Sequence, residues 1–193
     1  MAEESTSTSP EQRRVADLIS SRRDEILNLW ITERLESDDF RDELISKKEL
    51  LHQSRQVLEM LAQALRESDG SDFDHPAFAD LRAYLNEISH MRAVKGYTPT
   101  ENATYILALR NVTLPLLAEE LENDASLLIR EANYFTRLLD KSGLVMVETF
   151  IRSREEIIRQ QRADMMELST PVIKVWDKIL TLQIGRASCR ERV

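Results

Sequence analysis

Cysteine, glycine and proline are scarce in this chain of 193 residues, which contains one cysteine, four glycines and five prolines. The single cysteine, Cys189, excludes an internal disulfide framework and a zinc site built from cysteine pairs. Glycine and proline are the strongest helix breakers, so their scarcity leaves few points at which a helix must stop. The composition therefore favours long helices.

Long apolar runs and an excess of basic residues are also lacking. No apolar run approaches the roughly 20 residues that span a bilayer, and the acidic N-terminus has no basic-then-apolar signal-peptide pattern. Nucleic-acid binding depends on neutralising phosphates with Lys and Arg, so a net charge of −8 argues against it. We expect a cytoplasmic protein that binds neither a membrane nor nucleic acid.

Motifs of catalysis are missing as well. The chain has no Gly-rich phosphate loop, no Gly-x-Ser-x-Gly motif and no cysteine pair with zinc spacing. The acidic loop 69–74 departs from the order of glycine and acids in an EF-hand. We therefore predict a non-enzymatic protein with no catalytic residue, no cofactor and no bound metal.

Two sets of side chains leave a ligand-binding alternative open. His52 and His90 fall in successive predicted helices and would form a haem or metal pair if these helices brought them together. Histidines of this kind more often stand singly on a helix wall. A set of aromatic residues either lines a sensory pocket or packs in the core, and helical spacing favours the core. Its members are Trp30, Tyr97, Tyr105 and Tyr134.

The hydrophobic pattern predicts an all-α fold. Hydrophobic residues make up 42% and charged residues 31% of the chain, as in globular proteins. Apolar residues recur at steps of three and four, which predicts about five helices over 10–36, 41–67, 76–94, 99–122 and 124–168. Periodicity does not define crossing angles, so a globin-like arrangement and a simpler bundle both remain open.

Local signals predict several helix ends. Thr98 and Glu101 match a capping box at the start of the fourth helix. Gly96 predicts the stop of the helix before it. Asp74 and Asp124 are the predicted N-caps of the third and fifth helices.

The last predicted helix carries an apolar stripe with the alternating spacing of a coiled coil. Six of its eight positions are apolar, which predicts the pairing of two such helices in a homodimer. The polar exceptions, Arg154 and Gln161, either fix the register of the pair or show that stripe and surface drift in a short stalk. The predicted dimer seam consists of Leu144, Val147, Ile151, Arg154, Ile158, Gln161, Met165 and Leu168.

A helix stop and a strand follow the seam. Pro171 ends the helix because it disfavours helical backbone at Thr170 and has no N–H to donate. The apolar and β-branched residues of 172–182 then predict a strand or hairpin.

These segments resemble a known signalling family. Residues 167–182, ELSTPVIKVWDKILTL, are similar to the start of the STAS domain of RsbR-type proteins, the co-antagonists that build bacterial stressosomes. Residues 14–162 resemble the N-terminal domain family of those co-antagonists. The phrases that carry this second resemblance are RRDEILNLW, GYTPT and IRSREEIIRQQ.

The resemblance implies a signalling module that senses a stimulus, dimerises and passes the signal to a STAS domain. It implies that the STAS domain joins RsbR-like paralogues and binds a switch kinase controlling an anti-sigma pathway. It also implies a sensor domain that is globin-like without haem, and phosphorylated threonines that lie beyond Leu182. The alternative is a ligand- or haem-binding helical sensor domain with a different output.

The predicted organisation has five parts. A disordered tail (1–8) precedes a helical sensor domain (9–143), a coiled-coil linker helix (144–171) and the start of a truncated STAS domain (172–183). Residues 184–193, IGRASCRERV, match the translation of a common sequencing-library adaptor and break the hydrophobic pattern. We therefore expect the natural reading frame to continue past Leu182.

Sequencing genomic DNA across the codon of Leu182 tests this expectation. A STAS-like α/β continuation of roughly 100 residues, a typical domain length, is expected. A genome that itself encodes IGRASCRERV followed by a stop codon would show that the adaptor assignment is wrong.

Overall fold

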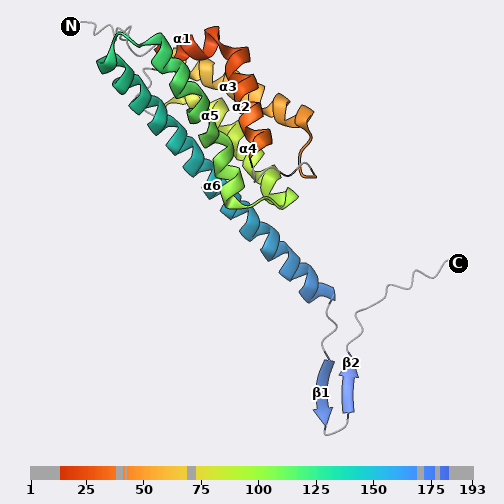
Figure 1. Ribbon diagram of the computed structural model, residues 1–193. Coiled ribbons are helices and arrows are strands. Elements are labelled where there is room, and N and C mark those ends of the chain that lie inside the picture. Colours follow the sequence, from red (N-terminus) through yellow and green to blue (C-terminus); the bar gives the residue numbers. More distant parts are fainter. Residues whose placement is uncertain are drawn as a thin grey trace, which may run out of the picture. The chain divides into compact units, whose positions relative to one another are not determined.

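The computed structural model describes residues 14–37, 41, 43–68, 73–168, 172–176 and 179–182. The chain divides into two compact units, residues 1–153 and 154–193, and Figure 1 shows the elements of each. The predicted tail (1–8), the adaptor-like segment (184–193) and the predicted helix stop at Pro171 lie outside the described residues.

The described part of the first unit is built from helices alone, which confirms the all-α prediction. Six α-helices occur in the described residues, rather than the five predicted, and the last of them continues into the second unit. They are α1 (Arg14–Ser21), α2 (Arg23–Glu36), α3 (Lys47–Glu67), α4 (Ala79–Lys95), α5 (Pro99–Glu120) and α6 (Ala125–Leu168), with a short 3₁₀ helix, η2 (Pro76–Phe78), before α4.

Trp30 and Tyr105 join three helices at the centre of the bundle. Both side chains are buried, and their ring centroids lie 4.9 Å apart. The indole Nε1 of Trp30 in α2 donates to the Tyr105 carbonyl of α5 at 3.0 Å. The Tyr105 hydroxyl lies 3.1 Å from the Ser54 hydroxyl of α3. Buried aromatic rings with satisfied polar ends thus link α2, α3 and α5.

The predicted first helix is two helices, because the chain bends at Arg22. The two residues before the bend turn their hydroxyls back onto the preceding turn: Ser20 donates to the Ala16 carbonyl at 2.6 Å and Ser21 to that of Leu18 at 3.2 Å. Such back-bonding competes with the helix ladder and bends helices. Arg22 itself has non-helical angles, φ −109° and ψ 26°.

Two predicted helix starts are wrong. The second predicted helix begins at Lys47 rather than near Arg41, and Ser46 is its cap, accepting from the Glu49 N–H at 3.2 Å. Before η2, His75 replaces Asp74 as the capping residue, and its Nδ1 accepts from the Ala77 N–H at 3.2 Å.

The other predicted ends are confirmed. Gly96 ends α4 in the left-handed conformation with φ +88°, which glycine adopts without a Cβ clash. Thr98 and Glu101 form the full capping box of α5. Asp124 accepts from the Leu127 N–H at 2.9 Å at the start of α6.

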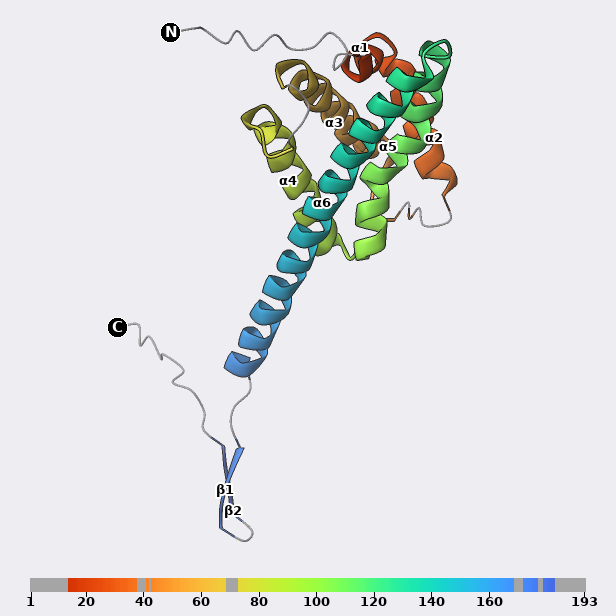
Figure 2. The same ribbon diagram turned by 90° about the vertical axis from the view of Figure 1, so that its left-hand side faces the viewer.

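The first part of α6, up to Ser153, runs beside α4 and α5 (Figure 1, Figure 2). It approaches α5 closely at Gly143, where an added Cβ atom would lie 3.3 Å from Cδ2 of Leu107. Asn102 of α5 donates to the Met146 carbonyl of α6 at 3.0 Å. Close backbone approach and a buried hydrogen bond therefore hold α6 on the bundle.

The second unit contains the end of α6 and a two-stranded antiparallel sheet. Strands β1 (Val172–Trp176) and β2 (Ile179–Leu182) pair Val172 with Leu182 and Lys174 with Leu180, with an irregularity before Trp176. A hairpin thus forms where the sequence predicts a strand or hairpin, while its assignment to a STAS domain stays a prediction.

Replacing Thr98 by Ala tests the capping box. The substitution removes the acceptor of the Glu101 N–H, and we expect a loss of about 1 kcal/mol in the free energy of unfolding. Chemical denaturation followed by circular dichroism measures it. Thr100→Ala, at an exposed position two residues along the same helix, is the matched control. Equal losses in both variants would contradict the role of the cap.

Candidate functional site

Four apolar residues of the predicted dimer seam recur at intervals of seven along α6 and are exposed. The exposed fractions are 69% for Leu144, 48% for Ile151, 44% for Ile158 and 71% for Met165. Large apolar side chains in a row at this spacing are typical of a helix that pairs with another helix.

The remaining seam positions complete the same stripe. Val147 is half-buried, and Arg154 and Gln161 are exposed. The backbone of Leu168 is helical, while its side chain lies outside the described residues. All eight positions of the stripe belong to α6.

The bundle lies against a different side of α6. Leu139, Met146 and Ser153 are buried and also seven residues apart. Met146 follows Leu144 by two residues, which is a rotation of about 200° around an α-helix. The bundle-facing row is therefore nearly opposite Leu144, while the other row of the seam, which begins at Val147, lies about 100° from Met146.

Hydrogen bonds hold the bundle-facing side of α6 against α4 and α5. Thr149 donates to Oδ1 of Asn86 in α4 at 2.5 Å. Nδ1 of His90 lies 3.1 Å from the Ser153 hydroxyl. Together with the Asn102 bond to the Met146 carbonyl, these contacts give α6 a defined rotation on the bundle.

A small cavity lies inside the first unit, where α2, α3, α4 and α5 meet the segment before α3. Its volume is about 20 Å³, and eight of the residues that the structure describes line it. Three of them are arginines, of which Arg92 is 3% and Arg34 7% exposed. The residues lining the cavity are Arg34, Arg41, Ile45, Leu50, Arg92, Tyr97, Glu101 and Tyr105.

Among the described residues, Glu101 is the only carboxylate that lines this cavity. Nε of Arg41 lies 2.8 Å from its Oε1, and its Oε2 accepts from the Thr98 N–H at 2.5 Å. Burial raises the pKa of Glu101, but the hydrogen bonds with Thr98 and the ion pair with Arg41 outweigh it, so that the pKa lies below its usual value. The Glu101 charge is thus already matched by Arg41.

Arg92 lies between two tyrosine rings. Its Cζ is 3.9 Å from the ring centroid of Tyr105 and 5.4 Å from that of Tyr97. Burial lowers the pKa of this guanidinium, and the two tyrosines raise it. An arginine nonetheless keeps its proton in proteins, so the structure holds a buried positive charge here.

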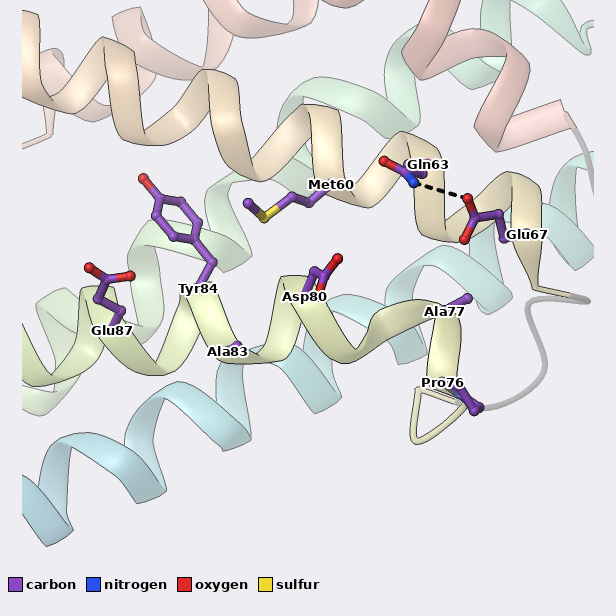
Figure 3. A pocket seen from close by; sticks show the side chains of 9 residues that line it. All are labelled: Met60, Gln63, Glu67, Pro76, Ala77, Asp80, Ala83, Tyr84 and Glu87. Atoms are coloured by element: carbon purple, nitrogen blue, oxygen red, sulfur yellow. Dashed lines mark hydrogen bonds between the residues drawn. The ribbon is translucent and has the colours of Figure 1, made fainter.

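An open groove of about 490 Å³ runs between α3 and α4 (Figure 3). Met60 and Tyr84 extend into it, and Glu67, Asp80 and Glu87 make its lining acidic. None of the described residues that line the groove is cationic, and in this respect the groove differs from the arginine-lined cavity.

The histidines do not build a buried ligand site. His52, His75 and His90 are all exposed, and His90 is engaged with Ser153. The described residues contain no group of three or more His, Cys, Asp or Glu side chains placed to hold a metal ion. No helix among them is long and apolar enough to cross a membrane.

The aromatic residues divide between the two roles that the sequence leaves open. Trp30 packs in the core, whereas Tyr97 and Tyr105 line the cavity. Arg92 is a cavity residue that was not predicted from the sequence. It continues the buried row Leu81, Leu85 and Ile88 of α4 at the helical period, and an arginine at an apolar period is the signal that identifies it.

Comparison with known families shows which family the chain belongs to. Residues 24–165 match the family described as the RsbT co-antagonist protein rsbRD N-terminal domain. The chain belongs to this family. Its RsbT co-antagonists are regulatory proteins of a partner-switching pathway. No curated protein and no solved structure matches the chain.

The match fits the region that carries the RsbR-type resemblance in the sequence. It spans α2 to α5 and α6 as far as Met165. It thus includes the arginine-lined cavity and the seam from Leu144 to Met165.

Titration of a Glu101→Gln variant of this RsbT co-antagonist domain tests the Arg41 pair. The pKa of Glu101 is lowered on folding, so its contribution is present above the unfolded pKa and is lost as the pH falls through the folded value. At neutral pH we expect the variant to lose about 1 kcal/mol of unfolding free energy, because the pair is partly exposed.

The difference between native and variant proteins should shrink as the pH falls below about 4. Denaturation curves at several pH values measure it. Glu120→Gln, at an exposed position of the same helix, is the control. A difference that stays constant down to the acid limit would exclude the proposed ionic role of Glu101.

Proposed function

We propose that this chain is the sensor and dimerisation arm of an RsbR-like stressosome scaffold. The observation that supports this proposal most directly is the row of four exposed apolar residues spaced seven apart: Leu144, Ile151, Ile158 and Met165. Exposed isoleucines and leucines cost free energy in water, and pairing two such rows removes them from it. In a homodimer, each of the two chains contributes one such row.

The two polar positions of the seam are consistent with a helix pair that can change its packing. Arg154 and Gln161 occupy positions where apolar side chains would give the most stable pair. Polar residues in a coiled-coil core fix register and lower stability. A marginal seam responds to a small bias, because the free-energy difference between two packings is then small.

The bundle is the source of that bias in this proposal. α6 belongs to the bundle up to Ser153 and continues as one helix to Leu168. A change in the bundle that rotates or tilts α6 alters the seam and is passed to a STAS domain. In this cytoplasmic assembly, the STAS domain contacts paralogous scaffold proteins and a switch kinase.

The double variant Ile151→Asp/Ile158→Asp tests the seam. A dimer buries four isoleucines at these positions, and each contributes about 1.5 kcal/mol. Their loss is expected to raise the dimer dissociation constant by about ten-thousandfold. Light scattering over a concentration series measures the molar mass.

The matched control is Gln160→Asp/Ala163→Asp, which adds the same charge at two exposed positions of α6 outside the seam. We expect the control to dimerise as the native protein does. A dimeric Ile151→Asp/Ile158→Asp variant, or a native protein that is monomeric throughout, would refute the proposed seam.

A further inference from the structure

We propose that the cavity lined by Arg92, Tyr97 and Glu101 binds a small inorganic anion of about the size of chloride. The site itself is independent of dimerisation. Its role as an input to α6 rests on the proposed function.

Arg92 carries a buried charge that no ion pair in the described residues matches. Its side chain is 97% buried, since its exposed fraction is 3%. Among the residues that the structure describes, no carboxylate forms an ion pair with Arg92, and its Nε has no hydrogen-bond partner. A buried charge without a bonded counter-charge is costly, and its neighbours here supply ring faces rather than oxygen acceptors.

The cavity also has hydrogen-bond donors that no acceptor of the described residues satisfies. The Tyr97 hydroxyl, like Nε of Arg92, has no hydrogen-bond partner in the described part of the chain. The Glu101 carboxylate is held by Arg41 and Thr98. Glu49, the next acid near Tyr97, pairs with Lys95 at 2.8 Å. Nε of Arg92 and the Tyr97 hydroxyl are therefore buried donors without acceptors in the described part of the lining, which is the chemistry that an anion completes.

The volume of the cavity matches a small anion. A cavity holds one water molecule when it exceeds roughly 10 to 15 Å³, and this one measures about 20 Å³. A monatomic anion fits this space. Sulfate or phosphate, with four oxygens around a central atom, would require Arg41 and Tyr97 to move. The geometry thus selects by size as well as by charge.

A chain of contacts joins this cavity to α6. Glu101 lines the cavity, and its neighbour Asn102 is buried. The Nδ2 of Asn102 donates to the Met146 carbonyl of α6 at 3.0 Å and to the Ser89 hydroxyl of α4 at 3.2 Å. An anion that draws Arg92 and Tyr97 together shifts the α4–α5 turn, from which Asn102 reaches α6.

Thermal unfolding of the full chain in sodium chloride and in sodium gluconate of equal ionic strength tests the site. A ligand that binds only the folded state raises the melting temperature by mass action, and we expect chloride to raise it by about 4 °C. Broadening of the chloride NMR resonance by the folded protein gives a direct readout of binding. Phosphate should have a smaller effect than chloride.

Substitutions of cavity residues test whether the chloride effect arises at this cavity. Arg92→Met should abolish both the chloride-dependent stabilisation and the line broadening. Tyr97→Phe keeps the ring and removes the hydroxyl, so the chloride concentration at half effect should rise about tenfold. Tyr84→Phe, in the acidic groove between α3 and α4, makes the same change elsewhere and should respond as the native protein does.

Identical melting temperatures in chloride and gluconate, without line broadening, would overturn the proposal. Full chloride dependence in Arg92→Met would overturn it too. If Arg92→Met does not fold, an unchanged half-effect concentration in Tyr97→Phe is the overturning result. Light scattering on the same samples separates this site from the seam, because anion binding and dimerisation are measured independently.

Discussion

Between Leu144 and Ser153, α6 carries both the bundle-facing row and part of the predicted seam on the same few turns, so that any rotation of this segment alters both surfaces. Met146 and Phe150 fill the core there, while Leu144 and Ile151 remain exposed. No loop separates these positions from the rest of α6, which is helical to Leu168.

The turn between α4 and α5 is the other fixed point of the first unit. Gly96 reverses the chain with a left-handed backbone, and Thr98 with Glu101 caps the next helix at once. Arg41 ties this turn to the segment before α3, through the Glu101 carboxylate and the Gly96 carbonyl. The same few residues thus close the cavity, start α5 and place Asn102 against α6.

The sequence was sufficient where a structure depends on neighbouring residues. The capping box at Thr98, the stop at Gly96 and the all-α class follow from local pattern, and the structure confirms them. It was not sufficient where distant residues compete. Arg41 lies outside α3 and pairs with Glu101, 60 positions along the chain, and the bend at Arg22 depends on serine hydroxyls that usually face solvent. The cavity brings together α2, α3, α4 and α5, which no short-range spacing reveals.

Gly143 limits the kinds of motion that α6 can make on the bundle. A single methyl group at this position would already lie 3.3 Å from Leu107. Sliding α6 by one helical turn, about 5.4 Å, would bring Leu139 or Val147 to the same place, and neither side chain fits there. Tilting about Gly143 keeps the glycine opposite Leu107 and avoids that clash. The close contact at Gly143 therefore favours tilting of α6 over a piston-like stroke along its axis.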